Sequence, residues 1–226
     1  MTPPETNLRL RNTYRLVPSR YPSAGILDTI SSPEDLETVI ELESWTNDRV
    51  SAELGVLHRI PQEEWVTGRP LSTVVMAAFC HPRPGGGRFS GPDRGAWYAS
   101  LTLETAHAEV IYHRTAELAE IGVFETYVQE RAYLADFTGR FHDIRAKEAA
   151  FRPFYSPTDY TKSQKLALEL LDIGSNGVIY RSVRHDGGYC VACFRPKLVV
   201  NVRLGEHFEY RWTGGPTPVV RKLTGR

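Results

Sequence analysis

Cysteine is scarce in this sequence of 226 residues, which holds three: Cys80, Cys190 and Cys193. A small, odd number of cysteines is typical of proteins in a reducing compartment and not of disulfide-stapled ones. Cys190 and Cys193 form one Cys-x-x-Cys pair in a predicted strand, where residues three apart face opposite sides. That spacing is poor for a disulfide or a metal site, so we expect buried core cysteines and no metal.

Long apolar runs and an excess of one charge are also missing. No apolar run is long enough to span a bilayer, and residues 1–11 lack the apolar core of a signal peptide. Lysine plus arginine and aspartate plus glutamate both number 27, so the formal net charge is zero. This balance argues against a nucleic-acid coat or a membrane-surface binder. We therefore expect a cytoplasmic protein without direct contacts to membranes or nucleic acid.

Several well-known catalytic motifs are absent as well. The three glycines at 85–87 do not form a Walker loop, because no Gly-Lys-Ser/Thr follows them. The sequence has no His-Glu-x-x-His zinc motif, no Rossmann fingerprint and no Gly-x-Ser-x-Gly nucleophile elbow around Ser182. These absences exclude the commonest nucleotide-binding, zinc-hydrolase and serine-hydrolase patterns.

What the sequence does contain is concentrated between residues 85 and 110. The glycines at 85–87 allow a sharp turn or a close approach to a ligand, and Arg88 directly after them suits a phosphate or carboxylate. The aromatic run 96–100 predicts a strand that carries Tyr98. A helix should follow, with Thr102 as its N-cap and Glu104 in its first turn.

Glu109 stands out in that helix. Leu103, Ala106, Val110 and Ile121 share one face at the helical period, and Glu109 lies on the flank of that face. Its side chain points back toward the start of the helix, where Tyr98 leaves the strand. Arg88, Tyr98 and Glu109 are therefore expected to converge at one cleft. The alternative is a surface glutamate paired with His113 or Arg114, beside a structural tyrosine and a turn arginine.

The N-terminal third predicts a strand followed by helices. Residues 14–17 form a short strand closed by Pro18, in which Arg15 points either into a pocket or out to water. Ser32 and Pro33 begin a helix, which breaks at residues 45–48 and resumes over 50–57. Residues from about 22 to 70 thus predict a helical arm, which either packs on the core or frames the pocket. Residues 72–79 predict a buried segment.

The second half predicts strands around one helix. Residues 123–134 and 189–194 alternate as strands do, and 199–202 form another strand. Residues 161–171 predict a helix that ends at Gly174. A strand opens at Gly177, and on it Tyr180, Ser182 and Arg184 share one face, which either grips a polar ligand or is simply exposed. The tail after residue 202 is rich in glycine and proline and predicts only loose order.

Four separated motifs together resemble those of the RES-domain toxins, which are named after an arginine, a glutamate and a serine. The motifs are Gly-Gly-Arg-Phe-Ser at 86–90, Trp-Tyr-Ala-Ser at 97–100, Thr-Ala-His-Ala-Glu-Val at 105–110 and Gly-Val-Ile-Tyr-Arg-Ser-Val-Arg at 177–184. The family residues map onto Arg88, Glu109 and Ser182, with Tyr98 as a further match. The resemblance runs from about residue 14 to 212. The chain departs from many relatives at Gly87, where they carry serine, and at Trp45, where they carry leucine.

The resemblance implies an α+β fold with split, mostly antiparallel sheets like those of ADP-ribosyltransferases. It implies one RES-like domain over residues 1–226, with the helical arm inserted near the N-terminus. It further implies a bacterial type II toxin that is paired with an Xre-like antitoxin protein. The implied substrate is NAD⁺, consumed by hydrolysis or phosphorolysis of its nicotinamide–ribose bond.

The resemblance also suggests roles for individual residues. Glu109 would stabilise the positive charge that develops on the ribose, and Tyr98 would stack on nicotinamide or brace the ribose. Arg88 and Arg15 would hold the pyrophosphate, and Ser182 would bind the ribose or the nicotinamide amide. Other residues expected to line the substrate site are Tyr14, Phe89, Ser90 and Arg184.

Two other functions stay open at this point. The same site can transfer ADP-ribose to a protein acceptor, which makes the chain a mono-ADP-ribosyltransferase. A non-catalytic module that only holds a nucleotide is the other possibility, and the intact set of Arg88, Tyr98, Glu109 and Ser182 weighs against it.

Overall fold

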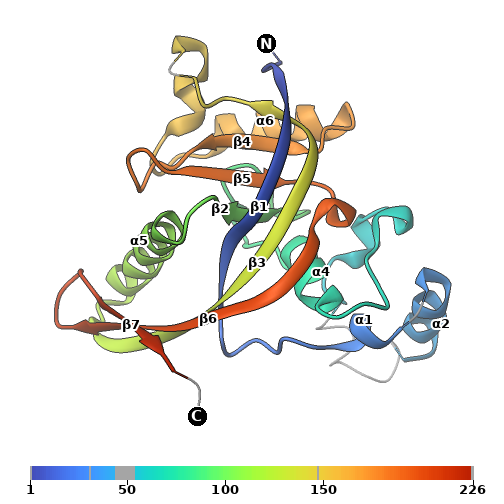
Figure 1. Ribbon diagram of the computed structural model, residues 1–226, viewed down its shortest axis with the longest axis horizontal. Helices are drawn as coiled ribbons and strands as arrows, with labels where there is room; N and C mark the ends of the chain where they lie inside the picture. Colours follow the sequence, from blue (N-terminus) through green and yellow to red (C-terminus); the bar gives the residue numbers. More distant parts are fainter. Residues whose placement is uncertain (1, 31, 44–53, 147, 225–226) are drawn as a thin grey trace.

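A seven-stranded sheet forms the centre of the protein (Figure 1), as seen in a computed structural model that describes residues 2–30, 32–43, 54–146 and 148–224. The strand order is β1-β2-β5-β4-β3-β6-β7. The pairing of β3 with β4 is parallel, and the other pairings among the described strands are antiparallel. The strands are β1 (Glu5–Pro18), β2 (Trp97–Ser100), β3 (Glu125–Asp143), β4 (Gly177–Arg181), β5 (Tyr189–Cys193), β6 (Val200–Thr213) and β7 (Val219–Leu223).

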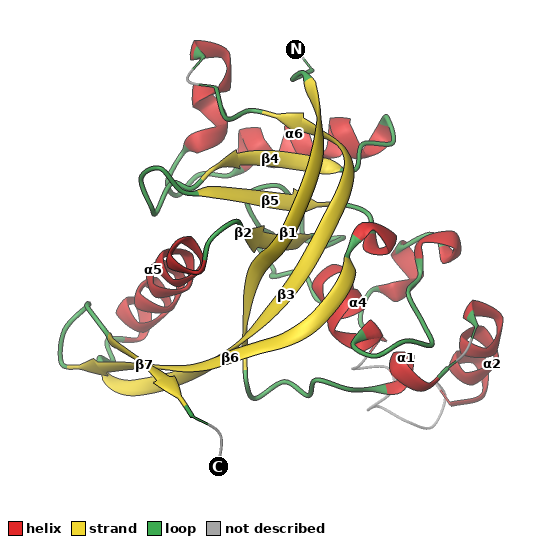
Figure 2. Cartoon of the chain, in the orientation of Figure 1, coloured by secondary structure: helices red, strands yellow, loops and turns green. Residues whose placement is uncertain are grey.

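The sheet closes on itself because β1 also pairs with β3. Strands β1, β3 and β6 are long and curve across the molecule, while the shorter β4 and β5 cross them at a steep angle (Figure 2). The predicted mixture of helices with a mostly antiparallel sheet is confirmed. The predicted likeness to ADP-ribosyltransferases stays a prediction.

Helices cover the sheet and divide the core into three clusters. One cluster joins α4 to the sheet around Trp97 and Phe137, a second packs α6 and η3 around Phe89 and Tyr180, and a third lies between α5 and the strands β3 and β6. The helical segments are α1 (Ile26–Thr29), α2 (Pro33–Glu43), α4 (Ser72–Cys80), α5 (Leu103–Ile121) and α6 (Thr161–Asp172), with the 3-10 segments η1 (Leu57–Arg59), η2 (Gln62–Glu64), η3 (Ala149–Tyr155) and η4 (Pro196–Leu198).

The cysteines lie where the alternation of β5 places them. Cys190 belongs to the cluster under α6, whereas Cys193 faces the cluster under α4. All three cysteines are buried and free. The prediction that Cys190 and Cys193 face opposite sides of a strand is confirmed.

Several predicted helix boundaries are also confirmed. The Ser32 hydroxyl accepts a hydrogen bond from the Asp35 amide at 3.1 Å, as expected of the cap of α2. The range 22–70 contains α1, α2, η1 and η2. The predicted helix break at 45–48 lies outside the described residues, and so does the resumed helix up to residue 53. The predicted buried segment is α4, most of which is shielded from water.

Three strand predictions are wrong because long-range pairing extends the strands. β1 begins at Glu5 instead of residue 14, since it pairs with β3 from Glu5 opposite His142 to Pro18 opposite Glu130. The strand predicted at 123–134 begins two residues later, at Glu125, and extends as β3 to Asp143. The tail is not loosely ordered, because β6 runs to Thr213 and β7 pairs with it. Charged residues on the exposed faces hide the alternation that marks a strand in the sequence.

Gly177 begins β4 in a conformation that other residues rarely adopt, with φ of +141°. A Cβ built there would lie 2.1 Å from the Ala192 carbonyl oxygen on the paired strand. We expect Gly177→Ala to lower the free energy of unfolding by about 1–3 kcal/mol from the backbone strain, with the clash adding to this loss. Urea unfolding measures the change.

Gly122→Ala is the matched control for this variant. Gly122 also has a positive φ, of +69°, but a Cβ there meets no atom within 4 Å. Its free energy of unfolding should therefore fall only by the roughly 1–2 kcal/mol that a non-glycine residue costs in the left-handed conformation. Equal losses in the two variants would show that the contact with Ala192 is unimportant.

Candidate active site

Helix α5 carries the candidate carboxylate. The Thr102 hydroxyl accepts a hydrogen bond from the Thr105 amide at 3.3 Å, so the predicted N-cap is confirmed. The helix then runs to Ile121 and ends at Gly122. Ile121, the last residue of the helix, is exposed, contrary to its predicted place on the apolar face.

Glu109 is held between three side chains from other parts of the site. The Ser182 hydroxyl donates a hydrogen bond to its Oε1 at 2.7 Å, and the Cys190 thiol lies 3.9 Å from the same oxygen. His113 Nε2 is 3.9 Å from the other oxygen, Oε2. The Glu109 side chain is 27% exposed, so it is partly shielded from water and partly accessible.

The alternation predicted Ser182 on a strand face, and this prediction is wrong. Strand β4 ends at Arg181, and Ser182 begins the loop to β5. Its hydroxyl accepts hydrogen bonds from the amides of Arg184 and His185, both at 3.0 Å, while it donates to Glu109. The hydroxyl thus both closes this turn and fixes the carboxylate.

Arg184 lies in the same loop, also beyond the strand. Its guanidinium carbon is 3.3 Å from the centroid of the Tyr112 ring, and its Nη2 donates to the carbonyl of Pro157. Arginine stacked on an aromatic ring is well suited to remain charged while it contacts a ligand.

The glycine turn is tied to strand β2 by the Tyr98 hydroxyl. This hydroxyl accepts a hydrogen bond from the Phe89 amide at 2.8 Å and donates to Ser90 Oγ at 3.0 Å. Burial raises the pKa of Tyr98 to about 12, so the hydroxyl keeps its proton at neutral pH. Ser90 Oγ also accepts from the Gly87 amide at 3.2 Å. Tyr98 and Ser90 therefore hold the turn in shape.

Arg88 braces the other side of the turn. It is buried, and its Nη1 donates to the carbonyls of Phe154 at 3.0 Å and Ser156 at 2.7 Å. Its guanidinium carbon also lies 4.6 Å from the centroid of the Tyr160 ring. Arg88 thus fastens the segment 154–160 to the glycine turn.

Tyr180 lies at the centre of the predicted residues. Burial raises the pKa of its hydroxyl, and the charges of Cys190, Glu109 and Tyr98 raise it further, whereas Arg88 lowers it. Its ring packs edge-on against Phe89, with the ring centroids 4.8 Å apart. Phe89 thus contacts this buried tyrosine directly, while Arg88, Tyr98 and Glu109 are near enough for their charges to affect its pKa.

Arg15 points inward and not to water. Its Nη1 donates to the Tyr98 carbonyl at 3.2 Å, and its guanidinium carbon lies 5.0 Å from the centroid of the Trp97 ring. Burial lowers the pKa of Arg15 to about 10, which still leaves it charged at neutral pH. Tyr14 is its neighbour on β1, and adjacent strand residues face opposite sides. Tyr14 is therefore turned away from the face that carries Arg15.

His113, one of the two alternative partners considered for Glu109, does lie next to it. Burial lowers the pKa of His113 to about 4, and the positive charges of Arg83 and Arg184 act in the same direction. His113 is therefore neutral at neutral pH, and its contact with Glu109 is not an ion pair. Arg114, the other proposed partner of Glu109, instead binds Glu130 at 2.9 Å and Glu117 at 2.6 Å.

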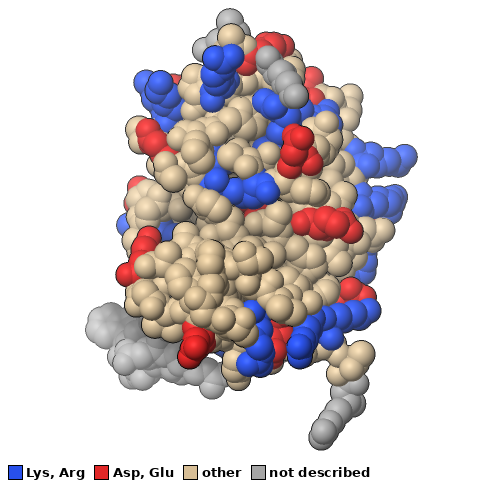
Figure 3. All heavy atoms as spheres, turned by 90° about the vertical axis from the view of Figure 1, so that its left-hand side faces the viewer, with Lys and Arg blue, Asp and Glu red and all other residues tan. Residues whose placement is uncertain are grey.

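The charges around the site are mixed. Figure 3 views the molecule from the side on which α5 lies, and basic and acidic side chains alternate there around a broad uncharged area. Among the described residues, no group of three or more His, Cys, Asp or Glu side chains is placed to hold a metal ion. None of the described helices combines the length and apolar character needed to cross a membrane.

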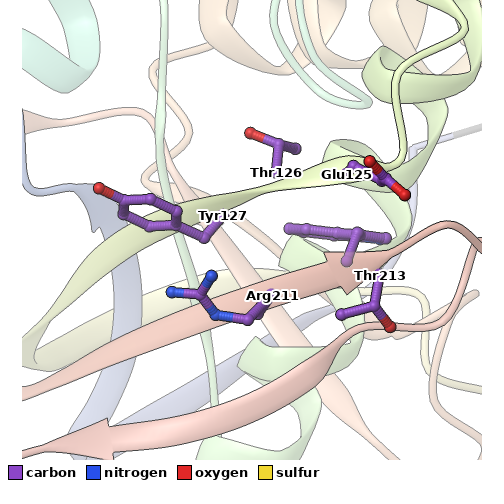
Figure 4. Close-up of a pocket in the computed structure, with 6 residues that line it drawn as sticks. Glu125, Thr126, Tyr127, Arg211 and Thr213 are labelled. Carbon is purple, nitrogen blue, oxygen red and sulfur yellow. The ribbon is translucent and has the colours of Figure 1, made fainter.

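A separate recess of about 430 Å³ lies on β3 and β6 (Figure 4). Arg211 stacks on Tyr127 there, with 4.9 Å between the guanidinium carbon and the ring centroid, and it also pairs with Glu209. The recess shares no residue with the Glu109 site and lacks a cluster of groups suited to catalysis. Its lining residues are Glu125, Thr126, Tyr127, Arg211, Trp212 and Thr213.

Comparison with known proteins places this site in a recognised domain. The model of the RES domain family matches residues 56–213. The uncharacterized protein y4oC of Sinorhizobium fredii (strain NBRC 101917 / NGR234) is 27% identical over 204 residues, which cover 89% of this chain and 83% of that protein. A solved structure, the M. tuberculosis MbcT-MbcA toxin-antitoxin complex, aligns with a TM-score of 0.48 and 12% identity, over 90% of this chain and 86% of that one.

Removing the Tyr98 hydroxyl tests its structural role. Tyr98→Phe leaves the buried Phe89 amide without its acceptor, so we expect the free energy of unfolding to fall by about 1–3 kcal/mol. Urea unfolding measures this. Tyr127→Phe is the control, because the Tyr127 side chain is exposed on β3. Equal stability of Tyr98→Phe and wild type would contradict the assignment.

The low pKa of His113 makes stability depend on pH. An unfolded histidine binds a proton near pH 6.5, whereas the folded protein resists this down to about pH 4. The contribution is thus complete above about pH 6.5 and is lost as the pH falls toward 4. Between pH 7.5 and 5, thermal unfolding should show a larger loss for wild type than for His113→Asn. A larger loss in the variant would contradict the burial of a neutral imidazole.

Proposed function

Because this chain belongs to the RES domain family, we propose that it consumes NAD⁺ by cleaving the bond between nicotinamide and ribose. We further propose that it acts as the toxin of a toxin–antitoxin pair, with an Xre-like protein as its antitoxin. The carboxylate of Glu109, fixed by Ser182 at 2.7 Å and partly exposed, carries this proposal.

One carboxylate is enough for this reaction. When the C1′–N bond breaks, its electron pair moves to the pyridinium nitrogen, and nicotinamide leaves as a neutral molecule without needing an acid. The ribose is left with an oxocarbenium-like positive charge, as in glycoside hydrolysis. A carboxylate that is already oriented in a partly desolvated site stabilises such a charge, because neither the protein nor water has to reorganise when the charge develops.

The neighbours of Glu109 suit that task. The Ser182 hydroxyl orients Oε1, which leaves Oε2 to face the ribose. Neutral His113 adds no positive charge that would compete with the cation forming at C1′. Because Glu109 is partly exposed, a water molecule can reach the ribose; it attacks C1′ and releases its proton to Glu109 or to solvent, giving ADP-ribose. Attack by phosphate gives the corresponding phosphorolysis product.

The arginines suit the diphosphate of NAD⁺. Arg88 uses Nη1 to hold the segment 154–160, and we assign its other N–H groups to the substrate. Arg15 is charged and fixed on the Tyr98 carbonyl. Guanidinium groups bind phosphate oxygens in a bidentate manner.

A protein acceptor is the alternative to water or phosphate. The carboxylate is 27% exposed, which leaves room for an acceptor side chain to approach. The products distinguish these reactions: free ADP-ribose indicates hydrolysis, ADP-ribose with an added phosphate at C1′ indicates phosphorolysis, and a labelled protein in a lysate indicates ADP-ribosyl transfer. A module that only holds the nucleotide yields none of them.

Replacing Glu109 with glutamine keeps the size of the side chain and removes its charge. We expect Glu109→Gln to lower the rate of nicotinamide release by about 10²–10³-fold, with NAD⁺ binding changed by only a few-fold. Chromatography of the products measures the rate, and calorimetry measures the binding.

Glu120→Gln provides the control, because Glu120 is exposed on the same helix. It should turn over NAD⁺ at the wild-type rate. If Glu109→Gln did the same, Glu109 would have no catalytic role.

A further inference from the structure

The loop that joins β4 to β5, residues 182–188, lies along one face of helix α5. Three of its side chains contact three residues of the helix, which are spaced four and three positions apart and therefore share that face. These pairs are Ser182 with Glu109, Arg184 with Tyr112 and His185 with Thr105. The first two pairs belong to the site described above, whereas the third lies about one turn of helix before the carboxylate.

His185 is bound to the helix through a buried hydroxyl. Its Nδ1 lies 2.8 Å from Thr105 Oγ1, and Thr105 is buried. The same hydroxyl lies 3.0 Å from the hydroxyl of the N-cap, Thr102. A buried hydroxyl that loses one of its partners is left without water to replace it, so the loss is costly. The contact therefore fastens the loop to the first turn of α5.

Gly188 leaves the space that this hydrogen bond occupies. A Cβ built on Gly188 would lie 2.5 Å from Thr105 Oγ1 and 2.9 Å from His185 Nδ1. The Gly188 carbonyl also closes the loop, because it accepts a hydrogen bond from the Ser182 amide at 2.8 Å. A side chain at position 188 would therefore push the imidazole and the hydroxyl apart.

The main chain of His185 leads directly to the hydroxyl of Ser182. The His185 amide donates to Ser182 Oγ at 3.0 Å, and the His185 carbonyl accepts a hydrogen bond from the Gly188 amide, also at 3.0 Å. The place of His185 thus sets the place of the Ser182 hydroxyl. That hydroxyl in turn orients Oε1 of Glu109.

We propose that His185 is a positioning residue, whose imidazole fastens the loop 182–188 to Thr105 and so keeps the Ser182 hydroxyl on the Glu109 carboxylate. In this role His185 acts through Ser182 and not on the substrate. The inference rests on the proposed function, since it concerns the carboxylate that would stabilise the ribose cation. A carboxylate that is free to turn stabilises such a cation less, because it must first be reoriented.

Hydrogen exchange followed by NMR tests the anchor without relying on turnover. His185→Ala should speed the exchange of the Ser182 and Arg184 amides about tenfold, because the hydrogen bonds that these amides make inside the loop become easier to open. His185→Asn should restore slow exchange, since the asparagine amide lies near the position of Nδ1. His185→Gln, whose amide lies nearer the position of Nε2, should restore less.

Turnover of NAD⁺ tests the effect on the carboxylate. His185→Ala should lower kcat about 10- to 100-fold with KM nearly unchanged, because the orientation of Glu109 matters most in the transition state. His185→Asn should recover more of kcat than His185→Gln does. Gly188→Ala should lower kcat as His185→Ala does, although it leaves the imidazole present. Thermal unfolding checks that each variant is folded at the assay temperature.

Asp186→Asn is the matched control. Asp186 follows His185 in the loop and is exposed, and its side chain accepts a hydrogen bond from the Gly187 amide at 3.1 Å, which asparagine can also accept. Its amide exchange and its kcat should equal those of wild type. A merely structural role of His185 predicts instead a lower melting temperature for His185→Ala with no change in kcat.

The outcomes separate the two proposals. If the Ser182 and Arg184 amides exchange equally fast in wild type and in His185→Ala, the anchor is wrong, whether or not NAD⁺ is consumed. If wild type consumes NAD⁺ and His185→Ala keeps the same kcat, the positioning role is wrong although the proposed function holds. If exchange is faster in His185→Ala and slow again in His185→Asn, but wild type never consumes NAD⁺, the anchor is correct and the proposed reaction is wrong.

Discussion

The hydrogen bond from the Ser182 hydroxyl to the Glu109 carboxylate is the contact on which the site depends. It joins a helix to a loop 73 residues further along the chain. The same hydroxyl accepts two main-chain amides, so it can be replaced neither by a residue without a donor nor by one without an acceptor. A carboxylate oriented in this way is prepared for a cationic centre before any ligand arrives.

A second set of contacts keeps the glycine turn rigid beside that carboxylate. Gly86 has a φ of +70°, which the turn requires and which glycine adopts without strain. The Tyr98 hydroxyl holds the turn from the sheet, and Gln164 of α6 donates to the carbonyls of Gly85 and Gly87 at 2.8 and 3.0 Å. Arg88 links the turn to the segment 154–160. Two residues first assigned to the substrate, Tyr98 and Arg88, therefore also build the frame of the site.

The sequence anticipated the local features of this site. The Thr102 cap, the start of α2 at Ser32 and the opposite faces of Cys190 and Cys193 follow from rules that involve only neighbouring residues. The prediction that Tyr98 and Glu109 lie near each other rests on a strand and a helix that are adjacent in sequence. The sequence-based predictions were wrong about the length of β1, because its pairing with β3 joins residues more than a hundred positions apart. They were wrong about Ser182, because β4 ends at a turn without a clear sequence signature.

The sequence by itself determined which groups are present and how each short segment folds, because helix caps, strand alternation and glycine turns are encoded within a few residues. Only the tertiary structure decided what those groups contact. Burial and long-range packing made His113 neutral, paired Arg114 with Glu130 instead of Glu109, and turned Arg15 inward. Such outcomes depend on desolvation and on charges from distant segments, which no local pattern records.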